Sequence, residues 1–249
     1  MSWLEAARIL TQDTDGDGRV DQYGIALVGG IPENYFAFTP ILWANGGDYF
    51  DENNNIVFDS EEAIEALEFW GELSKFAPPG VSNTRSDAAV QFSQGICAMI
   101  AYPGRILTNI ERYNPEIEGK LGFAPIPAGP SADETVIKAT INNFVVFKGT
   151  KHPELAKKFI EFYLAEEQYL EFLTSSVPGH ALPVRSGWLE NEEFFESPQI
   201  KKNQEIIKKA MGLVLEKGID FQFRHDTVNP YLGQALADPL LSQEINNCL

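Results

Sequence analysis

The chain has 249 residues, 44% of them hydrophobic and 22% charged, so it is long enough to bury a core without disulfide or metal staples. Its 19 basic and 36 acidic residues give a formal net charge of −17, which disfavours nucleic acids and anionic membrane surfaces as partners and suits neutral or cationic small molecules. Two cysteines exclude a disulfide framework and a cysteine-based zinc site, and no apolar run reaches the roughly 18 residues that would cross a membrane.

Periodicity and turn residues predict short helices and strands in alternation over the first half of the chain. Asp59 or Ser60 is expected to cap a helix with Glu62 in its first turn. The apolar stripe of that helix is expected to be Ile64, Leu67, Trp70 and Leu73. In order, the predicted elements are a helix at 3–11, an acidic loop at 13–21, a strand at 23–29, a helix within 33–46, a hairpin at 49–58, the capped helix, a helix near 86–94, a strand around Cys97 and a helix near 105–112.

The second half of the chain is richer in helices. Pro153 opens a helix whose apolar residues are expected to face inward, namely Leu155, Ala156, Phe159, Ile160 and Tyr163. The other predicted elements are strands at 121–127 and 142–147, a helix near 166–174, a long helix from Ser197 to Gly218 and a helical stretch from 232 to the end. Alternating helices and strands predict an α/β fold.

The acidic loop has the carboxylate spacing of a calcium-binding loop. Aspartates occupy positions 1, 3, 5 and 9 of an EF-hand-type loop, and Gly18 stands where the chain must turn sharply. Position 12, which is a bidentate glutamate in an EF-hand, is Gly24. The loop therefore predicts either a weak structural calcium site or a polar turn that holds no ion. The candidate ligands are the carboxylates of Asp13, Asp15, Asp17 and Asp21 and the carbonyl of Arg19.

Aromatic residues recur at loop-like positions and at the ends of elements. Sugars present apolar C–H faces that stack on aromatic rings, and their hydroxyls are bound by Asn, Asp and Arg side chains such as Asn45 and Asp48, which lie beside these aromatics. The alternative is that most of the rings belong to the core, since 12% of the chain is aromatic. The candidate ligand contacts are Tyr35, Phe36, Trp43, Tyr102, Arg105, Asn142, Asn229 and Tyr231.

Catalytic patterns are weak. The three histidines have no metal-ligand spacing, and the chain has no nucleophile elbow, zinc-protease motif or phosphate-binding glycine loop. No carboxylate pair suited to glycoside hydrolysis can be singled out among 36 acidic residues. Three classes of function stay open at this point: a sugar-binding protein, a carbohydrate-active enzyme and a calcium-stabilised interaction module.

Seven segments, taken in chain order, share one further pattern. They are Asp13–Gly24, Leu42–Gly47, Ala98–Arg105, Gly122–Pro127, Leu155–Phe162, Gly179–Arg185 and Tyr231–Leu236. Together they resemble the extracellular solute-binding proteins of family 1, which are the sugar-binding components of ABC importers and are similar to the maltose-binding protein. The resemblance covers nearly the whole chain.

This resemblance implies a periplasmic-binding-protein-like (type II) two-lobed fold with the ligand between the lobes. Residues 1–21 then form the leading helix and acidic loop, residues 22–138 and 184–249 the second lobe, and residues 139–183 a segment of the first lobe. On that template most of the first lobe and a final helix are absent. We therefore expect uncovered apolar faces on Phe144–Phe147 and on the helix that carries Phe159, Phe162 and Tyr163.

The resemblance also implies a function. The protein would be the substrate-binding component of an ABC importer, not an enzyme, and would bind a sugar or oligosaccharide in an interlobe cleft by aromatic stacking and hydrogen bonds. The implied partners are the sugar and the membrane permease subunits, without nucleic acid and without direct membrane insertion. A full-length member would be periplasmic or extracellular, lipid-anchored or free, although this sequence shows no signal peptide. Calcium, in a structural role, is the one cofactor expected.

Overall fold

The computed structural model describes residues 2–30, 33–79, 84–117, 120–133, 135, 137–138, 144–176, 181–183, 191–201 and 204–217. These residues group into two compact units. Unit 1 takes the described parts of residues 1–102 and 124–138, and unit 2 takes those of residues 103–123 and 139–219. The lobe boundaries that the resemblance implies stay a prediction, and each unit is described by itself.

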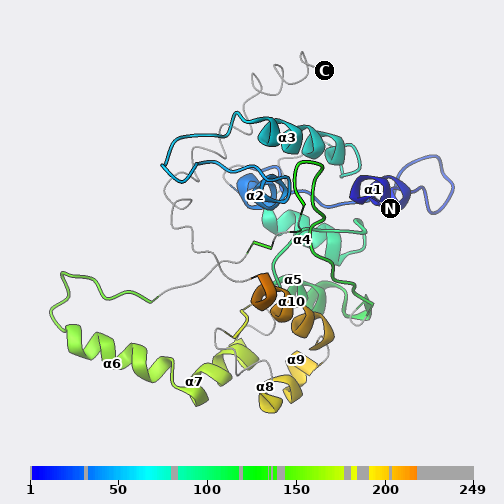
Figure 1. Ribbon diagram of the computed structural model, residues 1–249. Coiled ribbons are helices and arrows are strands. Elements are labelled where there is room, and N and C mark those ends of the chain that lie inside the picture. Colours follow the sequence, from blue (N-terminus) through cyan, green and yellow to red (C-terminus); the bar gives the residue numbers. More distant parts are fainter. Residues whose placement is uncertain are drawn as a thin grey trace. The chain divides into compact units, whose positions relative to one another are not determined.

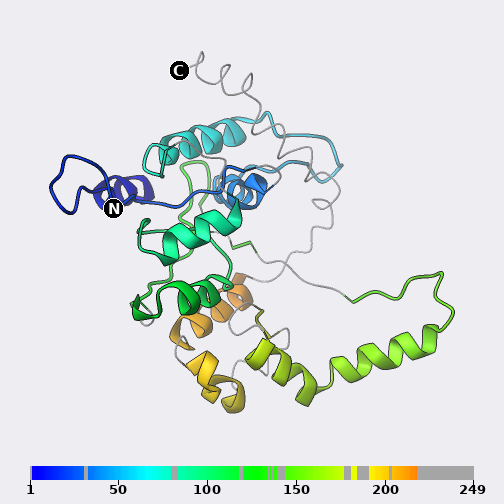
Figure 2. The same ribbon diagram turned by 180° about the vertical axis from the view of Figure 1, so that it is seen from behind.

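Unit 1 contains α1 (Trp3–Leu10), α2 (Asn34–Ala44), α3 (Glu61–Ser74) and α4 (Arg85–Ser93) (Figure 1). Hydroxyl caps begin α1, α3 and α4, because a side-chain oxygen there accepts an otherwise unpaired N–H of the first turn. The Ser60 hydroxyl accepts from the N–H of Ala63 at 3.3 Å, which settles the choice between Asp59 and Ser60 as the cap. The α2 and α3 helices lie side by side in both views (Figure 2).

The core of unit 1 forms around two extended segments that pair in parallel. One bridge joins Tyr23 to Cys97 and the other joins Ala26 to Ile100. The predicted strands at 23–29 and around Cys97 are thus neighbours, although each forms only isolated bridges. Cys97 is buried, as expected. The largest buried core side chains beside this pair are Ile25, Phe38, Leu42, Tyr49 and Leu73.

The predicted hairpin is confirmed at Phe50 and Ile56, which form an antiparallel bridge. The Asp51 carboxylate closes the turn by accepting the N–H groups of Asn53 and Asn55, each at 2.8 Å. Asn54 adopts a left-handed conformation with φ of 62°, which asparagine tolerates better than most residues. The turn therefore depends on residues that are adjacent in sequence.

A buried asparagine connects three segments of unit 1. The Asn45 amide nitrogen donates to the Glu62 carbonyl at 2.8 Å and to the Glu65 carboxylate at 3.0 Å. Its carbonyl oxygen accepts the N–H of Ser131 at 3.3 Å. Asn45 is only 4% exposed, and these hydrogen bonds make its side chain a link between α2, α3 and the segment around residue 131.

Unit 2 consists of short helices and one turn of π-helix in its described residues. They are α5 (Ile106–Tyr113), η1 (Pro115–Ile117), α6 (Pro153–Tyr163), α7 (Glu166–Glu171), η2 (Phe172–Ser176), α8 (Glu192–Glu196), α9 (Pro198–Lys201) and α10 (Gln204–Lys217). Their core is Leu107, Tyr169, Leu173, Phe194, Phe195, Ile200, Ile207 and Met211. Across both units, no described helix combines the length and apolarity that a membrane span requires.

The structure corrects several expectations about strands and helix faces. Residues 121–127 and 144–147 form no strand, because none of the described residues pairs with them in a ladder, and residues 142–143 lie outside the described ranges. In α3, Ile64 is 51% exposed, because the helix buries Ala63 and Ala66 instead. The long helix predicted from Ser197 to Gly218 is helical in its described residues, Pro198–Lys201 and Gln204–Lys217, and residues 202–203 and 218 lie outside the described ranges.

The helix opened by Pro153 differs most from its predicted packing. None of the residues of α6 is buried, and Leu155, Phe159 and Phe162 are 66%, 57% and 60% exposed. The expectation that Leu155 and Phe159 face inward is therefore wrong. The expectation of an uncovered apolar face on this helix and on Phe144–Phe147 is confirmed.

Candidate functional site

The acidic loop brings three of its predicted ligands together. Carboxylate oxygens of Asp13, Asp15 and Asp21 all lie within 4.8 Å of one another, and all three residues are exposed. Asp17 is not part of this group; its carboxylate accepts the N–H of Arg19 at 2.8 Å. The antiparallel bridge between Gln12 and Gln22 closes the loop at its base.

Backbone hydrogen bonds favour the ionised form of one of these carboxylates. The N–H groups of Gly18 and Gly16 donate to Asp13 at 2.8 Å and 2.6 Å. These bonds, the one from Gly18 first, hold the pKa of Asp13 below its usual value. A charged Asp13 in a tight loop of oxygen atoms is what a hard cation such as Ca²⁺ needs.

The structure also explains why the loop lacks its last ligand. A Cβ atom on Gly24 would lie 2.0 Å from the carbonyl oxygen of Ala7 in α1. No residue with a side chain fits at this position, so no glutamate can stand there. Any ion in the loop would lack the bidentate contact, which favours affinities toward the millimolar end of the range for such loops.

We propose that the loop binds one Ca²⁺. Calcium at about 10 mM is expected to raise the melting temperature by roughly 3–10 °C, because a ligand that binds only the folded state stabilises it by mass action. Differential scanning fluorimetry with calcium, magnesium and EDTA measures the shift. Asp15→Asn should abolish it, and Asp133→Asn, an exposed change outside the loop, should not. A shift that persists in Asp15→Asn would contradict the site.

The predicted sugar-contacting aromatics fall at several places. Tyr35 and Phe36 lie in the first turn of α2 with ring centres 4.2 Å apart, whereas Trp43 lies in its last turn. Trp43 is half-buried and donates its indole N–H to the Asp48 carboxylate at 3.2 Å. Tyr102 is a half-buried residue of unit 1. The structure thus places the rings of Tyr35 and Phe36 close together. The convergence of all eight predicted ligand contacts on one site stays a prediction.

The remaining predicted ligand contacts lie in unit 2 or outside the described residues. Arg105 is exposed and precedes α5 in unit 2. Asn142, Asn229 and Tyr231 lie outside the described residues. The described part of the predicted site is therefore mostly a feature of unit 1.

Two positively charged side chains lie close to the Tyr35–Phe36 pair, and the sequence did not predict either of them as a neighbour of this pair. The guanidinium carbon of Arg85 lies 4.3 Å from the centre of the Phe36 ring. The Lys138 ammonium lies 4.5 Å from the same centre and 5.3 Å from that of Tyr35. No sequence signal could have found this cluster, because Arg85 and Lys138 are far from α2 in the chain and from each other.

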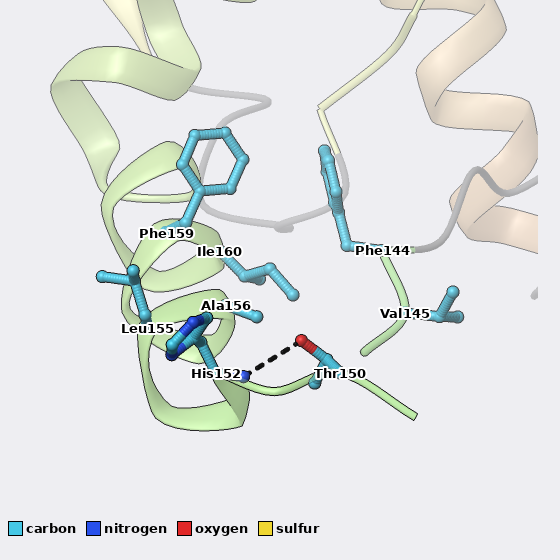
Figure 3. A pocket seen from close by; sticks show the side chains of 8 residues that line it. All are labelled: Phe144, Val145, Thr150, His152, Leu155, Ala156, Phe159 and Ile160. Atoms are coloured by element: carbon cyan, nitrogen blue, oxygen red, sulfur yellow. Dashed lines mark hydrogen bonds between the residues drawn. The ribbon is translucent and has the colours of Figure 1, made fainter. Parts of the chain in front are cut away.

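Unit 2 contains a groove of about 410 Å³ between residues 144–150 and α6 (Figure 3). Phe144 faces Phe159 and Ile160 across this groove, and the Thr150 hydroxyl accepts the N–H of His152 at 3.3 Å. The other lining residues are Val145, Leu155 and Ala156. Its lining is mostly apolar, with Thr150 and His152 as the polar residues, and it contains none of the predicted sugar contacts.

Two of the solved structures with a similar fold are bound to maltose and to ribitol. Maltose-bound MalE3 of T. maritima superposes with a TM-score of 0.72 at 21% identity, over 100% of this chain and 65% of that chain. An ABC transporter solute-binding protein of Agrobacterium radiobacter K84 in complex with ribitol gives a TM-score of 0.69 at 19% identity, over 98% of this chain and 61% of that chain. These likenesses confirm the predicted periplasmic-binding-protein-like (type II) fold.

Residues 3–169 match the bacterial extracellular solute-binding proteins, and the chain belongs to this family. An arabinooligosaccharide-binding protein of Halalkalibacterium halodurans is 27% identical over 163 residues, which are 62% of this chain and 36% of the relative. A putative ABC transporter periplasmic-binding protein of Escherichia coli K12 is 24% identical over 197 residues, 77% of this chain and 43% of the relative. The chain thus spans less than half the length of these two relatives.

Proposed function

We propose that this chain binds a sugar or an oligosaccharide as the substrate-binding component of an ABC importer and catalyses no reaction. Membership of the solute-binding family over residues 3–169 carries the proposal. The sugars and polyols named for its structural neighbours, maltose and ribitol, and the arabinooligosaccharide named for a relative support the class of ligand. Its partners would be permease subunits, and its location periplasmic or extracellular.

The binding mode that we propose is aromatic stacking combined with hydrogen bonds in a cleft between two lobes. Rings offer large, rigid apolar faces to the C–H faces of a sugar, and polar side chains fix its orientation. Tyr35, Phe36 and Trp43 are all half-buried, so each keeps part of its surface accessible. The other proposed contacts are Tyr102, Arg105, Asn142, Asn229 and Tyr231.

Isothermal titration calorimetry tests this function directly. We expect a saturable signal with at least one of arabinobiose, arabinotriose, maltose, maltotriose, mannitol and ribitol, with and without calcium. A carbohydrate-active enzyme would instead cleave an oligosaccharide, which chromatography of the same samples detects. A calcium-dependent interaction module would respond to calcium and to none of the sugars. Cleavage, or no sugar response at millimolar ligand, would contradict the proposal.

Trp43 provides a sharper test of the binding mode. Trp43→Ala is expected to weaken sugar binding by about tenfold or more, since buried aromatic contacts dominate most ligand interfaces. The same change should lower the unfolding free energy less than Trp70→Ala, because Trp70 packs on the buried Phe38 ring at 4.9 Å. Tyr231→Ala should behave as Trp43→Ala does. If the order of the two tryptophan variants in stability were reversed and sugar affinity unchanged, Trp43 would be a core residue.

A further inference from the structure

The α6 helix of unit 2 presents a stripe of large apolar side chains to its surroundings. Leu155, Phe159 and Phe162 are each more than half exposed. They are four and three residues apart, and residues at that spacing lie above one another on the same side of a helix. Another side of α6 is occupied by residue 144, because the ring centres of Tyr163 and Phe144 are 5.1 Å apart. The stripe therefore lies on a side of the helix that has room for a partner.

Two opposite charges border this stripe along one edge. Lys158 stands three residues after Leu155 and four before Phe162, so it lies beside the stripe. Glu161 follows Lys158 by three residues and lies on the same edge of the helix. Both side chains are exposed, and within the described part of the chain no ion pair includes either of them. A partner helix can therefore pair with both charges.

A second copy of α6 that runs antiparallel to the first matches the stripe and the charges together. When Leu155 lies against Phe162 of the second copy, two-fold symmetry sets Phe159 beside its own counterpart at the axis. Each helix edge then meets the same edge of the other helix. Lys158 lies opposite residue 159 of the second copy, about 3 Å along the helix axis from Glu161 of that copy, so the two charges can pair. The symmetry forms this ion pair twice.

A parallel arrangement lacks this match. It would set Lys158 against Lys158 and Glu161 against Glu161, and like charges repel. The direction of the pair therefore follows from the order of the two charges along the helix.

The charge of unit 2 is compatible with a contact between two copies. The whole chain has a net charge of −17, which by itself would keep copies apart. Residues 103–123 and 139–219, however, contain 13 basic and 14 acidic residues, a net charge of −1. Most of the repulsive charge thus belongs to other parts of the chain. At physiological salt, exposed charges more than about 8 Å apart are largely screened from each other.

We propose that α6 pairs with α6 of a second copy in an antiparallel, two-fold symmetric dimer. The apolar stripe of Leu155, Phe159 and Phe162 supplies the affinity, because pairing removes its exposed surface from water. The ion pairs between Lys158 and Glu161 set the direction. This inference is independent of the proposed sugar binding, since none of the predicted sugar contacts lies in α6.

Sedimentation velocity at about 1–100 µM protein tests the dimer. We expect the 27.7 kDa chain to form a species of twice that mass with a dissociation constant of about 1–100 µM, because two 11-residue helices make a small interface. Phe159→Gln should weaken the dimer by about tenfold or more, since the ring is lost from both copies at the axis. Ile64→Gln changes an exposed apolar residue outside α6 and should have no effect.

Charge reversals test the direction of the pair. Lys158→Glu and Glu161→Lys should each weaken the dimer by about tenfold, because two attractions become two repulsions. Combining both changes should bring the affinity back to within about threefold of the parent protein. A parallel pair would respond to neither single reversal. Lys120→Glu makes the same change of charge at an exposed lysine of unit 2 outside α6 and is the matched control. Melting curves confirm that each variant is folded.

Four results would overturn this inference. A monomer at every concentration would reject the dimer, and co-sedimentation of that monomer with phosphatidylcholine or phosphatidylglycerol vesicles would assign the stripe to a lipid surface. Species that grow beyond a dimer with concentration would show non-specific association instead of a closed pair. A dimer that persists unchanged in Phe159→Gln would lie at another surface. A dimer that ignores both single charge reversals would not be antiparallel through this edge.

Discussion

Replacing Gly24 by alanine is expected to lower the free energy of unfolding by about 3 kcal/mol or more. The added Cβ would lie 2.0 Å from the carbonyl oxygen of Ala7 and 2.7 Å from its Cα. Both atoms belong to the backbone of α1, which cannot turn aside as a flexible side chain can. Ala7 is fully buried, so moving α1 away would expose part of the core of unit 1. It would also strain the hydrogen bond from the Gly24 N–H to the Thr11 hydroxyl, now 2.9 Å.

Urea unfolding followed by tryptophan fluorescence measures this loss, with Gly71→Ala as the control. Gly71 lies inside α3, and a Cβ there would meet nothing within 4 Å. Alanine at that position should be neutral or stabilise by about 0.5–1 kcal/mol, because it favours the helix. If Gly24→Ala unfolded at the same urea concentration as the parent protein, the close approach of α1 to Gly24 would be disproved.

The exposed apolar face of unit 2 is expected to bind a hydrophobic dye strongly and to promote self-association. Phe147, Val145 and Leu155 are 78%, 67% and 66% exposed, and α6 contributes no buried residue. Apolar patches of this kind are rare on monomers that stay apart in solution. Replacing Leu155, Phe159 and Phe162 together by glutamine should remove most of the dye fluorescence and reduce association in analytical ultracentrifugation. Ile64→Gln, an isolated exposed apolar residue of α3, should change neither.

The same face predicts low local stability. Opening α6 would expose little apolar surface that is not already exposed, so the free energy of local unfolding there should be small. Amide hydrogens within residues 139–183 are expected to exchange about tenfold or more faster than those in helices of residues 22–138. Mass spectrometry after deuterium labelling gives both rates. Uniform protection across both regions, in a monomer that binds no dye, would show that the chain covers this face itself.

Features that depend on neighbouring residues could be predicted from the sequence. The Ser60 cap uses the N–H of Ala63, three residues on, and the Asp51 turn uses N–H groups within four residues. The acidic loop is similar, because the hydrogen bonds to Asp13 come from Gly16 and Gly18. Such contacts form wherever the local chain adopts the right dihedral angles, whatever lies further away. The order of motifs along the chain likewise identified the family, which the matched residues 3–169 confirm.

Strands and helix faces were less predictable because each needs a partner from elsewhere. Residues 144–147 have the composition of a strand, yet among the described residues none forms a ladder with them. The periodicity of α3 suggested that Ile64 is buried, but the close contact of its small residues Ala63 and Ala66 with the core turns Ile64 outward. Hydrophobic periodicity in the sequence shows that a helix has an apolar side, but it does not show which part of the protein covers that side.

In the candidate site, too, some features follow from neighbouring residues and others need distant parts of the chain. The Tyr35–Phe36 pair could be proposed from its position at the start of a helix, whereas its two cations come from α4 and from the end of the 124–138 segment. Glu33 and Arg85, 52 residues apart, meet only when α2 and α4 are folded. Gly24 shows why a local pattern can mislead: its place in the loop calls for glutamate, but α1 leaves no room for any side chain there. The free space and the charges around a residue in a folded protein depend on segments that are remote in sequence. A local sequence pattern does not describe those segments, so it cannot predict them.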